Sequence, residues 1–195
     1  MMLNFKSFIG EEIKEVLEPL AELRIQVFRD YPYLYDGSID YEREYLKTYI
    51  NASQSFLFAV FDADQMVGAT TCIPLKDETA EVREPFLKAG TDLQTICYFG
   101  ESILLNEYRG QGLGNRFFEE REAHARNLGA QFSVFCAIKR PETHPLRPAD
   151  YQDLKPFWKK RGYSKSETLQ SLFSWKDIDE PEESPKLMEY WTKRL

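Results

Sequence analysis

The spacing of hydrophobic positions in the first fifty residues predicts a strand followed by two helices. Residues 2–8 alternate between apolar and polar side chains, as a half-buried strand does. After a turn at Asp36 and Gly37, Ser38 is a candidate N-cap for a second helix that ends near residue 50. The first helix is predicted from apolar residues that recur every three or four positions: Ile13, Val16, Leu17, Leu20, Leu23, Val27 and Phe28.

The next part of the chain reads as a hairpin, a helix and a strand. The runs SFLFAVFD and MVGATTCIPL are separated by a short polar segment at residues 62–65, which is typical of a β-hairpin. Residues 78–90 have helical spacing, and Gly90 can end that helix. The run TICYFGESILL, residues 95–105, predicts a further strand.

The second half of the chain continues with alternating helices and strands. A helix is expected over residues 113–128 and another over 154–161, and each is followed by a glycine. The run QFSVFCAI between them is apolar at nearly every position, which predicts a strand covered on both faces in the middle of a sheet. LQSLFSWKDI and LMEYWTKRL predict two final strands on either side of the acidic link at 179–185.

The order of these elements predicts one α/β (α+β) domain over residues 1–195. Its sheet would be mixed and flanked by helices, and the sequence contains neither an internal repeat nor a domain linker. Aliphatic and aromatic residues make up 43% of the chain, with ten Gly and ten Pro, so a folded domain is favoured over a disordered one. There is no basic, then apolar leader and no run of 18 apolar residues, which predicts a cytoplasmic protein without a membrane segment.

The charge distribution disfavours nucleic acid as a partner. The net charge of −7 would repel a phosphate backbone over most of the surface. Residues 139–165, however, contain eight Lys or Arg against three Asp or Glu, a local charge of +5 that leaves −12 for the rest of the chain. An anion can therefore bind near this segment.

The cysteines and histidines give no support for a disulfide framework or a metal site. Cys72, Cys97 and Cys136 are odd in number, far apart and set in apolar runs, so we expect three buried thiols. His124 and His144 do not have the spacing of a zinc motif, and we expect no metal cofactor.

The stretch EYRGQGLGNRFFEER combines three alternate glycines with the start of a predicted helix. The first amides of a helix have no partners within the helix, and its N-terminus carries a partial positive charge, so this position suits a phosphate. Gly110, Gly112 and Gly114 would leave those amides uncovered, and glycine adopts positive φ at little cost. The sequence thus predicts a phosphate-binding loop before the helix at 113–128.

The pattern of this loop narrows the ligand. It matches neither G-x-G-x-x-G nor G-x-x-x-x-G-K-[ST], so dinucleotide and P-loop sites are disfavoured. The run Arg109-Gly110-Gln111-Gly112-Leu113-Gly114 instead resembles the R-x-x-G-x-G pyrophosphate loop of the GCN5-related N-acetyltransferase (GNAT) superfamily. The order of predicted elements over about residues 55–176 is also similar to that family. The resemblance implies a GNAT-like, mostly antiparallel sheet and acetyl-CoA as co-substrate.

The resemblance also implies which residues hold the cofactor. The amides of residues 111–115 would bind the pyrophosphate, Arg109 would support the loop, and the preceding strand would offer backbone groups to the pantetheine arm. The basic segment at 139–165 would face the adenosine 3'-phosphate or form a solvated helix face. The implied cofactor residues are Leu104, Leu105, Arg109, Gly110, Gln111, Gly112, Leu113, Gly114 and Asn115.

Catalytic roles are less well defined by the residues. An alkyl ammonium must lose a proton before it attacks a thioester, and Glu101 on the strand before the loop is the first candidate base. The alternative is a structural carboxylate paired with a neighbouring arginine. Relatives often place a tyrosine acid where this chain has Trp158, so Tyr163 and Tyr151 are substitutes, with solvent as a further proton source. Cys136 lies in an apolar run without an adjacent His, which favours direct transfer in a ternary complex over a covalent intermediate on this thiol.

The acceptor side is the least determined part of the prediction. The N-terminal helices would shape the acceptor site, with Arg29, Tyr31 and Tyr33 as candidate contacts, although tyrosines there can equally cover the core. The implied function is transfer of an acetyl group to a primary amine of a small molecule or peptide. The alternative is a non-catalytic acyl-CoA-binding or regulatory domain of the same fold. A homodimer remains open.

Overall fold

A mixed seven-stranded sheet forms the centre of the computed structural model, which describes residues 2–195. Within these residues β4 and β5 pair in parallel, and the other neighbouring strands pair antiparallel. This confirms the mixed, mostly antiparallel sheet. The strands lie in the order β1 (Leu3–Ile9), β2 (Phe56–Asp62), β3 (Gln65–Pro74), β4 (Ile96–Leu104), β5 (Phe132–Ile138), β7 (Ser184–Arg194) and β6 (Ser164–Trp175).

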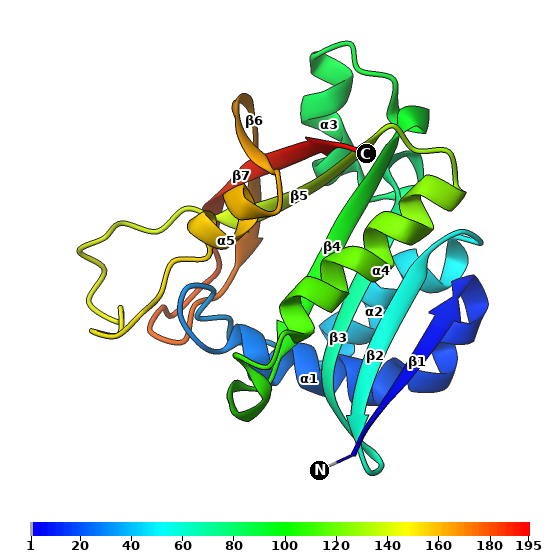
Figure 1. Cartoon of the computed structure of the whole chain (residues 1–195). Coiled ribbons are helices and arrows are strands. Elements are labelled where there is room, and N and C mark those ends of the chain that lie inside the picture. Colours follow the sequence, from blue (N-terminus) through cyan, green and yellow to red (C-terminus); the bar gives the residue numbers. More distant parts are fainter. Residues whose placement is uncertain (1) are drawn as a thin grey trace.

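Helices cover both faces of this sheet (Figure 1). Helices α1 (Leu17–Phe28) and α2 (Ile39–Asn51) lie behind it in Figure 1, and α4 (Leu113–Asn127) crosses in front of β2, β3 and β4. Helix α3 (Ala80–Lys88) packs near β6, and α5 (Lys155–Lys160) follows a long loop after β5. The short 3₁₀ helices are η1 (Gly10–Val16), η2 (Leu75–Asp77), η3 (Leu93–Thr95) and η4 (Asn106–Tyr108).

The predicted elements are confirmed, with differences at some boundaries. Ser38 caps α2, because its hydroxyl oxygen accepts a hydrogen bond from the Tyr41 amide at 3.4 Å. The predicted helix over 13–28 is divided: its first part is the 3₁₀ helix η1, and α1 begins at Leu17. Pro19 then falls in the first turn of α1, where its missing N–H costs nothing, whereas inside a longer helix it would break a hydrogen bond.

The sheet divides where β4 meets β5. These strands are joined through three residue pairs, from Ile96↔Phe132 to Tyr98↔Val134. Beyond them β4 continues along β3 and β5 continues along β7, and Figure 1 shows the two strands diverging. The β3–β4 register also shifts between Thr70 and Cys72, where β4 contributes one extra residue, so Gly100 and Glu101 form a β-bulge at the divergence.

The burial of β5 changes along its length because the sheet divides beside it. Ser133, Val134 and Phe135 are buried, as its sequence predicts, but Cys136 and the residues after it are half-buried. Cys136, Ala137 and Ile138 all line the pocket that forms between β4 and β5. The prediction of three buried thiols therefore holds for Cys72 and Cys97 and is wrong for Cys136. Among the described residues, no helix has both the length and the apolar character needed to cross a membrane.

Candidate active site

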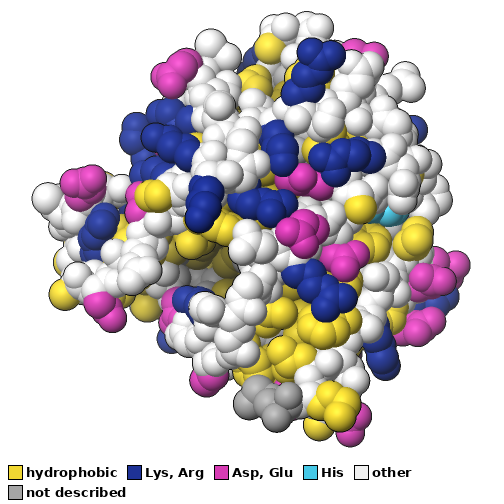
Figure 2. Space-filling model, viewed as in Figure 1, with side chains coloured by type: hydrophobic (Ala, Val, Ile, Leu, Met, Phe, Trp, Pro, Cys, Tyr) yellow, Lys and Arg dark blue, Asp and Glu magenta, His cyan; other side chains and the backbone are white. Residues whose placement is uncertain are grey.

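A pocket of about 880 Å³ lies where β4 and β5 diverge. Its walls come from the second half of β4, the second half of β5, the loop between α1 and α2, the start of α4, and the segment from residue 140 to α5. Figure 2 shows the hollow on this face, with hydrophobic side chains at its bottom and Lys and Arg side chains around it. Glu189 and Trp191 of β7 complete the lining, so the divergence of the sheet creates a site bordered by six separate segments.

The glycine loop opens into this pocket at the N-terminus of α4. Gly112 is the N-cap and has φ +84°, a conformation that a residue with a Cβ rarely adopts. Gly110 and Gly114 line the pocket. Among residues 2–195, no acceptor is found for the amides of residues 110–114, whereas the Asn115 amide donates to the Gly112 carbonyl at 3.0 Å. The run of unpaired amides is therefore shifted by one residue from the predicted 111–115.

Arg109 holds the loop to the preceding strand. Its Nε donates to the Leu104 carbonyl at 3.1 Å, and the Leu105 amide donates to the Val67 carbonyl of β3 at 3.0 Å. Gln111 braces the turn through a 3.1 Å bond from its side-chain amide to the Glu107 carbonyl. Leu104 lines the pocket, and the Leu113 side chain packs into the core. These contacts fix the backbone of the loop whose five amides have no acceptor among the described residues.

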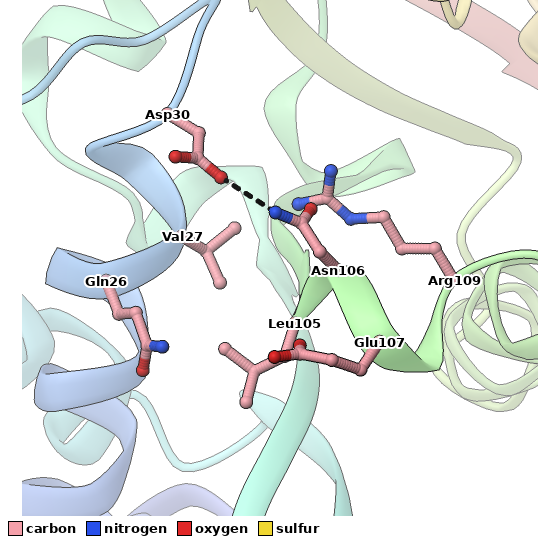
Figure 3. Close-up of a pocket in the computed structure, with 7 residues that line it drawn as sticks. All are labelled: Gln26, Val27, Asp30, Leu105, Asn106, Glu107 and Arg109. Carbon is pink, nitrogen blue, oxygen red and sulfur yellow. Dashed lines mark hydrogen bonds between the residues drawn. The ribbon is translucent and has the colours of Figure 1, made fainter.

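A second, smaller pocket of about 180 Å³ lies beside this loop (Figure 3). It separates the end of α1, with Gln26, Val27 and Asp30, from the segment after β4. Figure 3 shows the Asn106 side chain donating to Asp30 across it, at 3.3 Å. Asp30 and Asn106 also line the large pocket, so this bond ties the acceptor-side loop to the glycine loop.

Glu101 is buried and paired. Its side chain is 2% exposed, Arg24 forms an ion pair with Oε1, and the Thr71 hydroxyl donates to Oε2. Gly100 and Ser102 on either side line the pocket, whereas Glu101 does not. The bulge turns the Glu101 side chain toward α1, on the far side of β4 from α4. This is the arginine-paired arrangement that the sequence left open, and it does not test whether Glu101 also acts as a base.

Arg24 joins Glu101 to a second buried carboxylate. It also pairs with Glu42 of α2, and the three side chains carry a formal charge of −1. Oε1 of Glu42 is buried without a hydrogen-bond partner among the described residues. Two carboxylates therefore share one guanidinium directly beneath the β4 bulge, which gives this three-residue cluster one excess negative charge.

The three candidate positions for a general acid lie in different surroundings. The Tyr163 hydroxyl is buried against Ser133, at 2.8 Å, and Glu122, at 3.3 Å, and Tyr163 is not part of the pocket lining. Burial raises the pKa of Tyr163 well above its usual value. Trp158 and Tyr151 do line the pocket, and burial raises the pKa of Tyr151 as well. Of the two tyrosines, Tyr151 is thus the one that the fold brings to the pocket.

The predicted acceptor residues are only partly brought together. Tyr31 and Tyr33 line the pocket, and the Tyr31 ring meets that of Tyr151 edge-on at 4.7 Å. Burial raises the pKa of the Tyr33 hydroxyl. Arg29 does not line the pocket; its exposed side chain pairs with Asp36 at 3.2 Å.

Arg140 fixes the loop that carries these tyrosines. Its guanidinium donates to the carbonyls of Pro32 and Tyr33, both at 2.8 Å, and pairs with Asp177 at 2.7 Å. One member of the basic segment is thus a buried structural residue. Others have partners nearby, because Arg161 pairs with Glu119 and Lys165 with Glu189. Arg147 and Lys155 line the large pocket and are candidates for contact with an anion, although Lys155 also pairs with Asp153 at 3.0 Å.

Cys136 and Arg121 reach the pocket without having been predicted there. The Cys136 sulfur lies 3.1 Å from the Tyr98 hydroxyl, and burial raises the pKa of the thiol to about 12, which disfavours a thiolate nucleophile. Arg121 lies on the buried face of α4 and also lines the pocket. The sequence contained one signal for it, a charged residue four positions from both Phe117 and Ala125 on an otherwise apolar helix face.

Comparisons with known proteins identify the fold. No family model matches the sequence, and no curated protein sequence matches it significantly. Solved structures do match over the whole chain. A GNAT-family protein from Desulfovibrio desulfuricans has 13% identity and a TM-score of 0.59, and the match covers 99% of both chains.

Two further solved structures match with similar identity, TM-score and coverage. An acetyltransferase from Streptococcus agalactiae has 16% identity and a TM-score of 0.60, with 99% of this chain and 98% of that chain covered. The PaiA N-acetyltransferase from Thermoplasma acidophilum, solved in complex with coenzyme A, has 15% identity and a TM-score of 0.57, with both chains fully covered at 100%. The chain therefore has the GNAT fold, as the glycine motif predicted.

Proposed function

We propose that this protein is an acetyl-CoA-dependent N-acetyltransferase of the GNAT type. The observation that carries the proposal is the run of unpaired amides at residues 110–114, at the N-terminus of α4 and at the edge of the large pocket. Such amides, together with the helix dipole, suit the pyrophosphate of coenzyme A. The structural neighbours support the same ligand, because one of them was solved with coenzyme A.

The pantetheine arm would run from the glycine loop along β4. Beyond Tyr98 and Val134 the facing edges of β4 and β5 no longer pair with each other, so backbone groups there are open to a ligand. Leu104 would lie beside the arm, and the thioester would reach the bulge at Gly100. The adenosine 3'-phosphate would then lie toward Arg147 and Lys155.

The acceptor would be a primary amine of a small molecule or peptide. It would enter between Tyr31, Tyr33 and Tyr151, whose rings can contact a cationic nitrogen. The electronegative cluster of Arg24, Glu42 and Glu101 beneath the bulge favours an ammonium group nearby and can draw a proton from it. We propose Glu101 as the proton acceptor, through water from the pocket, in a direct transfer within a ternary complex.

The binding of acetyl-CoA can be tested without knowledge of the acceptor. A ligand that prefers the native state at 100 times its Kd stabilises it by about 2.7 kcal/mol. For a chain of this size, that corresponds to a rise in Tm of roughly 5–10 °C. Gly112→Asp should abolish the rise, because it places a carboxylate against the diphosphate. Gly112→Asn is the matched control, since asparagine tolerates positive φ and carries no charge.

Turnover separates the enzyme from a non-catalytic acyl-CoA-binding domain. Release of CoA thiol should be measured with polyamines, amino acids, aminoglycosides and peptides, for the native protein and for Glu101→Gln. Turnover that falls in the variant supports the enzyme. If acetyl-CoA binds but no amine is acetylated, the binding domain is the better description. If acetyl-CoA raises the Tm of Gly112→Asp as much as that of the parent, the glycine loop does not bind the diphosphate. Neither the enzyme nor the acyl-CoA-binding domain would then be supported.

A further inference from the structure

Arg121 is a buried cation without an anionic partner. Its side chain is 2% exposed and lies between two aromatic rings, 4.4 Å from the Phe99 centroid and 4.7 Å from that of Phe118. In the described part of the chain, no carboxylate oxygen lies within the 4.0 Å that would make an ion pair with it. Burying an unpaired charge costs several kcal/mol, so the position calls for an explanation beyond packing.

The hydrogen bonds of Arg121 do not supply that explanation. Its Nη1 donates to the Glu101 carbonyl at 3.3 Å, but the Thr70 hydroxyl already donates to the same oxygen at 2.7 Å. Its Nε donates to the Phe117 carbonyl at 3.2 Å, an oxygen one turn back along the same helix. The guanidinium therefore satisfies no acceptor that needs it, and it faces the large pocket.

The position of Arg121 matches the expected position of the thioester. Helix α4 connects the parallel strands β4 and β5, so it runs opposite to β4. Nine residues separate Gly112 from Arg121, about 14 Å along a helix. Four residues separate Leu104 from Gly100, about 13 Å along a strand. Both routes start near the amides of the glycine loop and end at the β4 bulge, where Arg121 contacts Glu101.

We propose that Arg121 is a catalytic residue that stabilises the negative charge on the coenzyme A sulfur as the thioester bond breaks. The inference rests on the proposed function. The amine nitrogen bonds to the carbonyl carbon, the carbon–sulfur bond breaks, and the sulfur leaves with the electron pair as a thiolate. The nitrogen loses its proton to the base or to water. Arg121 keeps its proton throughout, and solvent later protonates the free thiolate.

This role explains how the thiolate can leave although Trp158 stands where a tyrosine acid was expected. A leaving thiolate needs either a proton or a positive charge, and the tryptophan in that wall of the pocket has no hydroxyl to donate. A guanidinium stays protonated in proteins and acts by charge alone, which is worth more in a buried site than in water. Burial lowers the pKa of Arg121 from its usual value.

The groups that face Arg121 leave its charge available. They are Cys72 of β3, Cys97 and Glu101 of β4, and Tyr163 just before β6. Burial raises the pKa of Cys72 and of Tyr163, so both are neutral at pH 7. The Glu101 carboxylate pairs with Arg24, which it shares with Glu42, and Arg121 contacts the Glu101 carbonyl rather than the carboxylate.

The test uses the binding of coenzyme A and of desulfo-CoA, the analogue in which hydrogen replaces the thiol. If Arg121 stabilises the thiolate, the Kd of coenzyme A falls as pH rises from 6 to 9, relative to that of desulfo-CoA. A bound thiol whose pKa lies one unit below its free value gives a gain that approaches about tenfold once the pH exceeds both pKa values. Calorimetric titrations at several pH values measure both constants.

Variants separate this role from a structural one. Arg121→Met fits the apolar surroundings and should bind desulfo-CoA like the parent while losing the pH-dependent gain for coenzyme A. Arg121→Lys, which restores a positive charge, should recover part of it. Arg126→Met, an exposed position on the same helix, is the control. With any amine that is acetylated, Arg121→Met should lower kcat about 10²-fold and leave the KM for acetyl-CoA unchanged.

The outcomes distinguish the two proposals. If the parent binds neither coenzyme A nor desulfo-CoA, the proposed function fails. If it binds both with the same pH dependence, or if Arg121→Met keeps the gain for coenzyme A, the cofactor site stands and the role of Arg121 is wrong. If Arg121→Met does not fold, the role of Arg121 is still tested by the parent and Arg121→Lys. The pH dependence of the Kd for coenzyme A is then compared with that for desulfo-CoA in these two proteins.

Discussion

Gly100, in β4, has no room for an added methyl group. A Cβ there would overlap the Tyr49 hydroxyl and lie 2.7 Å from the Thr71 Oγ1. Both neighbours are fully buried and hydrogen-bonded, Tyr49 to Glu78 and Thr71 to Glu101. The glycine is therefore required by close packing beneath the bulge, independently of any ligand.

Gly100→Ala should accordingly destabilise the protein by roughly 1–3 kcal/mol, the usual cost of overpacking. Tyr49→Leu makes room at the same place, so the double variant should lose less than the sum of the single variants. Urea unfolding measures all three. Gly114→Ala is the control, because its Cβ would lie 3.6 Å from Phe157 and alanine favours a helix. Additive losses at 49 and 100 would contradict the packing argument.

Glu78 gives the fold a measurable pH dependence. Its carboxylate accepts from the Tyr49 hydroxyl at 2.9 Å and the Thr79 amide at 2.7 Å, yet burial raises its pKa from 4.5 to about 7. Between these values the folded state binds more protons than the unfolded state. The contribution of Glu78 protonation to the free energy of unfolding is therefore complete below pH 4.5. It is lost as the pH rises through about 7.

The predicted size of this loss is about 3 kcal/mol. Between pH 5 and pH 7.5, the free energy of unfolding of the parent should fall relative to that of Glu78→Gln, which has no proton to lose. Urea unfolding at both pH values measures the difference. Glu84→Gln, at an exposed position on α3, should instead follow the parent. Parallel pH profiles for the parent and Glu78→Gln would show that Glu78 has an ordinary pKa in the folded protein.

At the scale of elements, hydrophobic spacing predicted the order of helices and strands because most of them bury one regular face. It could not predict where a buried face also carries charge. Arg24 and Arg121 interrupt the apolar sides of α1 and α4, and both contact Glu101, which is 77 residues from Arg24 and 20 residues from Arg121. The glycine loop was predictable since the helix N-terminus and its ligand groups are local in sequence.

The loop between α1 and α2 shows the same limit. The tyrosines were recognised, but what holds them was not, because Arg140 reaches the loop from a segment 108 residues away from Pro32. The Trp175 indole also donates to the Tyr33 carbonyl, at 3.2 Å, and the Ile178 amide donates to that of Leu34, at 2.8 Å. The segment after β6 therefore fixes one wall of the proposed acceptor site.

Removing the guanidinium of Arg140 should loosen that wall. Arg140→Met removes one donor from the Pro32 and Tyr33 carbonyls and from the buried Asp177; Tyr33 keeps the Trp175 indole, and Lys186 remains 3.3 Å from Asp177. We expect a loss of about 3 kcal/mol in the free energy of unfolding, and a higher KM for the amine with an unchanged Kd for coenzyme A. Urea unfolding, calorimetry and the CoA-release assay measure these quantities.

Lys159→Met provides the control for this prediction. Lys159 is an exposed residue of α5, and its variant should match the parent in all three measurements. If Arg140→Met weakened coenzyme A as much as the amine, the loop would be coupled to the cofactor rather than to the acceptor.

At the scale of the whole molecule, the sheet consists of two parts joined by few bonds. Strands β1 to β4 form one part and β5, β7 and β6 the other, and three residue pairs link β4 to β5. The pocket occupies the space where the remaining pairs would be. A ligand that binds both edges would replace the missing hydrogen bonds and connect the two parts.

Hydrogen exchange can detect that connection. On binding of coenzyme A, exchange should slow at residues 100–105, 110–115 and 135–139, which border the pocket, and should remain unchanged in the β2–β3 hairpin. At 100 times the Kd, amides that exchange only from the free protein should slow by about 100-fold. Gly112→Asp should remove the effect in all three segments, since one ligand produces it. Protection confined to residues 110–115 would show that the phosphates bind without the arm entering between β4 and β5, and the proposed position of the thioester would then be wrong.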